Sequence, residues 1–486
     1  MNGVESIKKN YVLNVAYQVL LFATQLITAP YLSRVLGSEG IGINSYTNSV
    51  VTYFILFASL GTASYGQREV AMHRDDKNAG SLLFWEIELL SVTTTAIATL
   101  AWIVWLLVSV HYTGYYVALT INVISVAFDI SWYFAAFEKY RYIVIRNAVV
   151  RIAGMALTFI FIKSSNDLML YIIICAITGL VGNLSMWTYL PGMLTRIDRR
   201  MIHPFRRHLK QTFMYFIPTI ATSVYTVLDK TMIGIITGSE NENGYYEQAT
   251  KVIKAAETLL FSLNNVMYTR QSYLFSIGKI NEIKDKINKS FEYLFAVAIA
   301  IMFGLCGIAS NFVPWFFGRG YEPVIRLLWL MSPLPLVIAI SNVLGNQYLS
   351  PSGQRVRSTW GIIAGAVTNF ISNMLLIPRY GADGATVASV IAEFVISFIY
   401  VRMSRGYVSW RQLGKIAGKK IIAGVVMFLT VWILGRGHSG NFIITIVQII
   451  AAASAYIIML MLLHDRFALA MMKQVKEKMR HGKSQT

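Results

Sequence analysis

Charged residues and cysteines are scarce in this sequence, and their scarcity excludes several classes of protein. Only 14% of the 486 residues are charged, whereas 55% are hydrophobic. A soluble protein of this length could not cover so much apolar material with polar surface. Cys175 and Cys306 both lie in apolar stretches, and the seven histidines lack the spacing of metal ligands. We therefore expect no disulfide framework, no metal centre and no cofactor.

Long polar segments are also missing. No gap between the apolar stretches exceeds about twenty residues, which leaves no room for a folded aqueous catalytic domain. The glycine-rich run from Gly37 to Gly42 follows no predicted strand, so a turn between helices explains it better than a phosphate-binding loop does. The first apolar run is too long for a cleavable signal and continues into a polar turn. We expect a protein that is not an enzyme and that keeps its first apolar segment.

Apolar stretches of membrane-spanning length are abundant instead. Because a spanning helix needs about 20 apolar residues, we predict an all-α membrane protein with about fourteen transmembrane helices. The candidate spans cover residues 11–33, 41–66, 82–110, 113–137, 144–163, 167–190, 212–237, 248–274, 290–313, 323–349, 357–377, 382–402, 417–434 and 441–464. An even number of spans places both termini on the same side of the membrane.

The distribution of Lys and Arg identifies that side. These residues crowd the N-terminal tail, every second gap between spans and the C-terminal tail, and they are almost absent from the other gaps. Since positive loops stay in the cytoplasm, both termini are predicted to be cytoplasmic. The net charge of +19 is then explained by orientation and by contact with anionic lipid headgroups, not by nucleic-acid binding. The basic tail 465–486 either lies as an amphipathic helix on the inner leaflet or extends into solvent.

Polar residues recur on one helical face in two of the predicted spans. In the eighth span they are Lys251, Lys254, Thr258, Ser262, Asn265 and Thr269. In the first span they are Asn14, Gln18, Gln25 and Thr28. Such a stripe either bonds neighbouring helices or faces a wet interior, and the two lysines favour a water-filled cavity.

Charged residues inside the spans can be compared by their depth. Asp129 and Arg151 are equally far from the cytoplasmic turn near Tyr140, so they can pair, and such a pair could be purely structural. Asp229 and Lys254 are equally far from an outer turn. The other charged residues of this outer cluster are Lys230, Lys251 and Glu257. Because its cations outnumber its carboxylates, we expect Lys230 and Lys251 to meet an anionic ligand.

The chain also contains a short internal repeat. The segment Val35–Val50 follows the first span, and the similar segment Ile236–Val252 follows the seventh. Two units of six spans each would enter the membrane from the same side, which gives parallel repeats with a substrate path between them. The predicted organisation is an N-lobe at 1–200, a C-lobe at 201–405, two further helices at 406–464 and the basic tail at 465–486.

Four segments of the chain resemble bacterial polysaccharide flippases of the multidrug/oligosaccharidyl-lipid/polysaccharide exporter superfamily. They are Pro30–Gly42, Tyr65–Ala71, Asp129–Ile172 and Asn373–Glu393. The block with Trp132, Tyr133, Phe134, Glu138 and Lys139 is specific to the polysaccharide branch. The resemblance implies two six-helix lobes in a V, two extra C-terminal helices and alternating access. It also implies the bacterial cytoplasmic membrane and, as cargo, an undecaprenyl-diphosphate-linked repeat unit for O-antigen, capsule or exopolysaccharide.

The resemblance and the depth argument together give a set of candidate site residues. The diphosphate is expected to meet Arg34, Arg68, Lys230, Lys251, Lys254 and Arg270. Arg34 and Arg68 could equally be interfacial anchors. A proton or Na⁺ could couple at Asp129, Asp229, Glu257 or Glu393, with Arg151 as a pairing partner, or the membrane potential could drive export. Glycosyltransferases and a polysaccharide polymerase are the expected protein partners.

Three other functions remain open. A multidrug or organic-cation exporter would share the fold but should have an acidic, aromatic cavity. A lipid II flippase would differ only in its cargo. A membrane polysaccharide polymerase would need catalytic groups on a sizeable outer loop, and the longest outer gap here is only about ten residues, as short as an ordinary connection.

Overall fold

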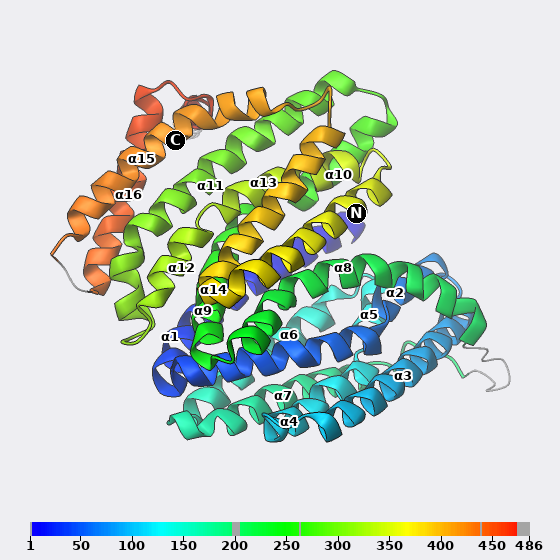
Figure 1. Cartoon of the computed structure of the whole chain (residues 1–486). Coiled ribbons are helices and arrows are strands. Elements are labelled where there is room, and N and C mark those ends of the chain that lie inside the picture. The colour runs from blue at the N-terminus through cyan, green and yellow to red at the C-terminus, as the bar shows by residue number, and fades with distance from the viewer. Residues whose placement is uncertain (1, 197–204, 262–263, 438–439, 474–486) are drawn as a thin grey trace, which may run out of the picture. The chain divides into compact units, whose positions relative to one another are not determined.

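Helices make up the regular structure of the chain in the residues that the computed structural model describes, which are 2–196, 205–261, 264–437 and 440–473 (Figure 1). This part of the chain contains no strand. The contacts divide the chain into two compact units, Met1–Gly234 and Ile235–Thr486. Each unit is built around its own buried apolar core.

The first unit begins with a helix that bends at a glycine. Its elements are α1 (Asn2–Ser59), α2 (Thr62–Met72), α3 (Lys77–Val108), α4 (Thr113–Ser125), the 3₁₀ turn Val126–Phe128, α5 (Ser131–Ala136), α6 (Tyr140–Phe161), the 3₁₀ turn Ser165–Asp167, α7 (Leu168–Trp187) and most of α8 (Phe205–Thr237). Inside α1, Gly37 has φ 70° and ψ 177°, a backbone conformation that residues with a side chain rarely adopt. The glycine therefore fixes the bend.

Aromatic side chains fill one core of the first unit. Trp132, Tyr133 and Phe134 on α5 are all buried, and Phe84 of α3 stacks on Trp132 with ring centroids 5.7 Å apart. Gly66 allows α2 to pack closely against α5, because a Cβ atom at residue 66 would lie 2.6 Å from the Trp132 ring. The aromatic part of the block that carries the family resemblance thus packs α5 against α2 and α3.

The second unit contains the remaining helices. They are α9 (Glu240–Phe261), α10 (Asn264–Ser276), α11 (Ile280–Phe316), α12 (Pro323–Met331), α13 (Leu334–Leu344), the π-helical turn Gly345–Leu349, α14 (Arg355–Met403), α15 (Trp410–Gly435) and α16 (Phe442–Leu462). Helix α14 bends at Gly381, whose φ is 54°, and Glu242 of α9 accepts a hydrogen bond of 2.7 Å from the next backbone N–H, that of Ala382. In Figure 1, α15 and α16 lie side by side, and both pack against α11.

The two repeated segments share a backbone feature. Gly37 and Gly238, which align in the repeat, both lie between helical segments with positive φ, 70° in one and 61° in the other. A left-handed glycine lets a helix end and a second one begin at once. A glycine with positive φ therefore stands at both junctions, inside α1 and directly after α8.

Ten helices of the described chain are long and apolar enough to cross a membrane. Two of them, of 57 and 49 residues, contain the bends at Gly37 and Gly381. At about 1.5 Å per residue, each exceeds twice the roughly 30 Å of hydrocarbon in a bilayer, so each can cross twice. The prediction of an all-α, multi-pass membrane protein is confirmed. The total of fourteen spans, the V-shaped arrangement and the cytoplasmic termini stay predictions.

Candidate functional site

Helix α9 separates an apolar face from a cationic one. Its buried face includes Ala249, Ile253 and Leu260, and the helix packs against α11, α12, α13 and α14. Another face carries Lys251, Lys254 and Thr258, which remain accessible. Helices α8 and α9 are too polar to be among the ten apolar spans. Accessible lysines inside a membrane fold typically face water or a charged ligand.

Lys251 is held in place within its own helix. Its Nζ lies 3.3 Å from Oε1 of Glu247, one turn earlier, with 29% of the Lys251 side chain exposed and 15% of the Glu247 side chain. Thr258 donates a hydrogen bond of 2.9 Å to the Lys254 carbonyl, so the threonine follows the same face. Ser262 and the side chains of Asn265 and Thr269, the rest of the predicted stripe, lie outside the described residues.

Asp229 and Lys230 lie on α8 in the first unit. Asp229 is buried and Lys230 is half-buried. The next residue, Thr231, fixes the helix against α1, because its hydroxyl donates to Ser49 Oγ at 2.8 Å and lies 3.1 Å from the Tyr53 hydroxyl. Lys230 thus belongs to one compact unit and Lys251 to the other. Their predicted convergence on one ligand stays a prediction.

The three candidate arginines are exposed side chains on different helices. Arg34 lies on α1. Arg68 lies on α2 and donates a hydrogen bond of 2.8 Å from Nη1 to the hydroxyl of Tyr215 on α8. Arg270 lies on α10, and its guanidinium carbon is 5.5 Å from the centre of the Tyr273 ring. All three guanidinium groups are therefore accessible to an anion, and Arg270 belongs to a different unit from Arg34 and Arg68.

The predicted pair of Asp129 and Arg151 does not form. Arg151 donates from Nε to Thr24 Oγ1 at 3.0 Å, whereas the carboxylate of Asp129 lies 3.8 Å from Nη1 of Arg146. The prediction counted residues along two continuous helices. The chain in fact tightens into a 3₁₀ turn before Asp129, which has an extended backbone with ψ 92°. The rise per residue in a 3₁₀ turn or an extended backbone differs from that in an α-helix. Equal numbers of residues from the cytoplasmic turn therefore do not place Asp129 and Arg151 at equal depth.

Arg146 instead belongs to a polar network between α4, α6 and α7. Its Nη1 donates to Asn183 Oδ1 at 2.7 Å, and Asn183 Nδ2 donates in turn to the carbonyl and the hydroxyl of Ser125. The Arg146 side chain is 11% exposed. No role was predicted for this arginine, although it lies five residues before Arg151 in the same helix.

The first unit contains a second group of ionisable residues that the sequence analysis missed. His208 of α8 lies between two partners, with Nδ1 2.6 Å from the Tyr65 hydroxyl and Nε2 2.8 Å from Glu86 Oε2. All three residues are buried. Glu88, two residues further along α3, is 3% exposed, and within the described residues neither of its carboxylate oxygens has a hydrogen-bond partner. These residues could have been noticed in the sequence, because Glu86 and Glu88 are two acids within the predicted apolar span 82–110.

The second unit brings two of the predicted coupling residues together. Glu257 of α9 and Glu393 of α14 are close enough for their charges to interact, and Lys254 acts on Glu257 from one turn away. Glu393 is buried and Glu257 is half-buried. Two carboxylates at short range share a proton or a cation more readily than they both ionise. The arrangement is therefore suited to bind one positive charge.

Comparisons with known proteins find similar sequences and similar folds. Residues 7–269 match the family model described as polysaccharide biosynthesis protein. A protein of Escherichia coli (strain K12), named "Putative O-antigen transporter", is 24% identical over 405 residues, which cover 82% of this chain and 97% of that protein.

Two solved structures share the fold. One, titled lipid II flippase MurJ in an inward closed conformation, has a TM-score of 0.72 at 16% identity and covers 93% of this chain and 97% of its own. The other, titled as the inward-facing conformation of a multidrug resistance MATE family transporter, has a TM-score of 0.61 at 11% identity and covers 84% of this chain and 99% of its own. At such identities the likeness concerns the fold alone.

Proposed function

Because this chain belongs to the polysaccharide biosynthesis protein family, we propose that its cargo is an oligosaccharide repeat unit linked to undecaprenyl diphosphate. The chain is a polysaccharide flippase of the multidrug/oligosaccharidyl-lipid/polysaccharide exporter superfamily, as the family match and the named transporters among its relatives indicate. Its direction of transport is from the inner to the outer leaflet of the bacterial cytoplasmic membrane. Glycosyltransferases supply the cargo, and a polymerase consumes it.

The observation that carries this proposal is the cationic face of α9. Lys251 and Lys254 remain accessible on a helix whose opposite face is buried against four apolar neighbours. A diphosphate accepts charge-assisted hydrogen bonds from such ammonium groups. An ammonium group is also a compact, flexible donor, which suits a cargo whose phosphates must be released again. These lysines therefore bind the diphosphate while the glycan occupies a hydrated path.

Alternating access follows from the chemistry of the cargo. A glycan presents many hydroxyl groups, and each one that loses its hydrogen bonds costs several kcal/mol, so it cannot cross about 30 Å of hydrocarbon unaided. A water-filled path that opens to one side at a time removes most of this cost without a leak. The undecaprenyl chain stays in the bilayer throughout.

Two sources of energy fit the charges of this chain. The membrane potential contributes about 2.3 kcal/mol per elementary charge per 100 mV, and an inside-negative cell favours the exit of a diphosphate. A cation bound between Glu257 and Glu393, or a proton on Glu88 or in the His208–Glu86 pair, would add a second gradient. Asp129 is a weaker coupling candidate, because it already faces Arg146, whereas the buried Asp229 stays a candidate.

The direct test removes the two lysines together. In a strain that lacks its own copy of the gene, the Lys251→Ala, Lys254→Ala variant should export at least about ten-fold less surface polysaccharide, because two charge-assisted contacts are each worth about 1.5 kcal/mol or more. Membrane insertion, measured by immunoblot of the membrane fraction, should be unchanged. A matched variant, Lys284→Ala with Lys286→Ala, removes two lysines from the polar start of α11 and should export normally. Normal polysaccharide in the α9 variant would refute the role of these lysines.

The structural similarity to a lipid II flippase favours one second candidate function. A lipid II flippase needs the same diphosphate contacts but a peptide-bearing cargo. Complementation separates the two: rescue of cells depleted of their own lipid II flippase supports lipid II as cargo, whereas restored surface polysaccharide in a deletion strain supports the repeat unit. Export of organic cations would instead require acids on the accessible face of α9, where the chain presents lysines.

A further inference from the structure

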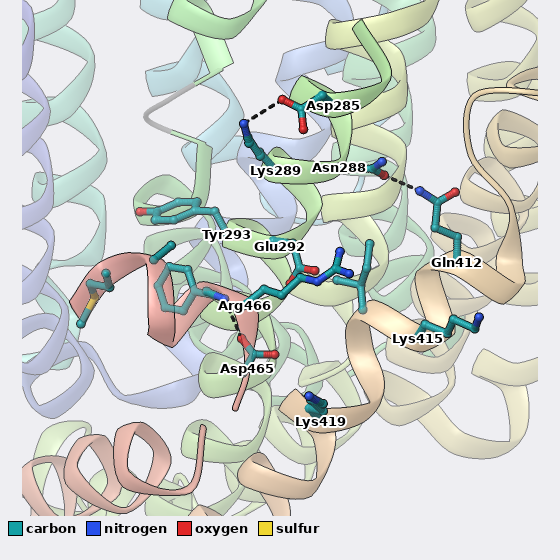
Figure 2. A pocket seen from close by; sticks show the side chains of 14 residues that line it. Asp285, Asn288, Lys289, Glu292, Tyr293, Gln412, Lys415, Lys419, Asp465 and Arg466 are labelled. Atoms are coloured by element: carbon teal, nitrogen blue, oxygen red, sulfur yellow. Dashed lines mark hydrogen bonds and ion pairs between the residues drawn. The ribbon is translucent and has the colours of Figure 1, made fainter. Parts of the chain in front are cut away.

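The second unit contains a cavity at the polar ends of its last helices. The cavity has a volume of about 1000 Å³ and is formed by the beginning of α11, the beginning of α15 and the segment after α16 (Figure 2). Helix α11 has 37 residues and is about 55 Å long, so it extends well beyond the roughly 30 Å of hydrocarbon in a bilayer. Its charged first turns, which line the cavity, are therefore at the membrane surface.

A buried ion network holds the three segments together. Nζ of Lys420 on α15, which is 1% exposed, lies 2.5 Å from Oε2 of Glu292 on α11 and 2.9 Å from Oδ2 of Asp465 after α16. Asp465 also accepts a hydrogen bond from the backbone N–H of Phe467 through Oδ1, and residues 466–473 are helical. This segment packs on α11, where the rings of Phe467 and Tyr293 meet edge to face at 5.9 Å. The site is thus built by residues far apart in the sequence.

Cations outnumber carboxylates around the cavity. Lys289 is paired with Asp285 at 2.7 Å, and Lys420 is held by Glu292 and Asp465. The remaining cations are Lys415, Lys419 and Arg466. Within the described residues these three form no ion pair, and Lys419 donates only to the carbonyl of His464, at 3.1 Å. The excess positive charge makes this concave site suited to an anion.

Two polar side chains of the lining, Gln412 and Asn288, hydrogen-bond to each other, and the other uncharged lining residues are largely apolar. The apolar part of the cavity wall includes Tyr293, Phe467 and Met471. Beyond Lys419 on α15, the exposed side chains are Ile421, Ile422 and Val425, which we expect to face the hydrocarbon. A soluble phosphate compound would have no use for this surface, whereas a lipid has a charged headgroup and acyl chains that match both parts. Basic pockets beside membrane helices on the cytoplasmic side are suited to anionic headgroups.

We propose that this cavity binds the phosphate headgroup of an anionic phospholipid of the leaflet on that side, with Lys415 and Arg466 as its main contacts. Lys419 completes the cationic rim, while the acyl chains lie along α15. The bound lipid is a structural ligand that ties α11, α15 and the C-terminal segment together. It is independent of the cargo and of the lysines on α9.

The test measures lipid binding to the purified full-length protein by native mass spectrometry. The probes are phosphatidylglycerol and phosphatidylcholine of identical acyl chains. The Lys415→Gln, Arg466→Gln variant should bind phosphatidylglycerol roughly 30-fold more weakly than the unmodified protein, because each basic residue near an anionic membrane surface contributes about five-fold. The control, Arg402→Gln with Arg405→Gln, loses the same charge from an exposed position outside the cavity and should bind normally.

Three outcomes would overturn the proposal. The cavity variant could bind phosphatidylglycerol as well as the control does, phosphatidylcholine could bind as well as phosphatidylglycerol, or inorganic phosphate at millimolar concentration could displace the lipid, which would identify a soluble anion as the ligand. Lys415 and Arg466 are exposed and lie outside the buried network, so the variant should keep its melting temperature when no phospholipid is added. If it does not fold, Lys415→Gln alone should weaken binding about five-fold, and unchanged binding would count against the proposal.

Discussion

At the scale of single residues, Lys420 shows how this chain tolerates a charge inside its core. Its ammonium group is buried with Glu292 and Asp465 and also donates to the carbonyl of Ile416 at 3.1 Å. A buried charge is tolerated only when partners replace its lost hydration, and removal of one partner leaves the others unpaired. Glu88, with no such partner among the described residues, represents the opposite case.

Replacement of this ammonium group should therefore destabilise the second unit. Lys420→Met leaves two carboxylates in a buried site without their cation, and breaking a buried pair in this way costs roughly 3–5 kcal/mol. A substantial drop in the melting temperature of the purified protein is the expected result. Lys419→Met, a neighbouring lysine that is exposed, should change it by little. Equal melting temperatures for the two variants would contradict a stabilising role for the network.

At the scale of elements, the bends at Gly37 and Gly381 decide where one long helix becomes two. Neither bend is caused by proline, although Pro30 and Pro378 each precede one of the glycines within the same helix. Both positions use a backbone conformation that a Cβ atom disfavours. The helical junctions of this fold are thus specified by single glycines.

Alanine at the first bend should reveal this requirement. Gly37→Ala places a side chain at φ 70° and ψ 177°, which costs about 1–3 kcal/mol although no atom obstructs the Cβ position. Gly179→Ala in α7 is the matched change, because it also has open space but normal helical geometry, and should be neutral or stabilising by up to about 1 kcal/mol. Thermal unfolding of both variants compares them. An equal loss of stability in the two variants would show that the backbone conformation at Gly37 is not its cause.

At the scale of the whole molecule, the fold class and the polar face of one helix could both be predicted from the sequence. Apolar runs and charge alternation predict an all-α membrane protein, and three- and four-residue spacing predicts that Lys251, Lys254 and Thr258 share a face. Both predictions depend only on local periodicity. The family resemblance extended them to a transporter, which the comparisons support.

Contacts between distant segments could not be predicted in this way. His208 and Glu86 are 122 residues apart, and Lys420 and Glu292 are 128 apart, so no periodicity connects them. The pairing of Asp129 was wrong because a 3₁₀ turn interrupts the helix from which its depth was counted. The helices α8 and α9 are also not among the ten apolar spans. Charged residues within a helix weaken the signal by which a span is recognised.

The buried acids of the first unit give a prediction about how transport is powered. Glu88→Gln keeps the shape of the side chain but removes its charge, and it should abolish any increase in polysaccharide export when the external pH is lowered. Asp129 acts on Glu88 through its charge, and Glu86, two residues earlier on α3, belongs to the hydrogen-bonded chain with His208 and Tyr65. Export is followed by labelled surface polysaccharide across a range of external pH.

Measurements of stability separate proton coupling from a structural role of Glu88. The amide is cheaper to bury than an unpartnered carboxylate, so the variant should be at least as stable as the unmodified protein. Glu39→Gln, which alters an exposed acid of the same unit, should preserve the response to pH. Export that responds to pH equally in both variants would exclude Glu88 from proton coupling.

The two bonds of Asp465 have a practical consequence for anyone who engineers this chain. This carboxylate both neutralises Lys420 and begins the helical segment at 466–473. A stop codon placed just after α16 would remove the residue and leave Lys420 with a single acidic neighbour. An affinity handle or a fluorescent fusion joined after Lys473 keeps both bonds, so it is the safer attachment point for purification.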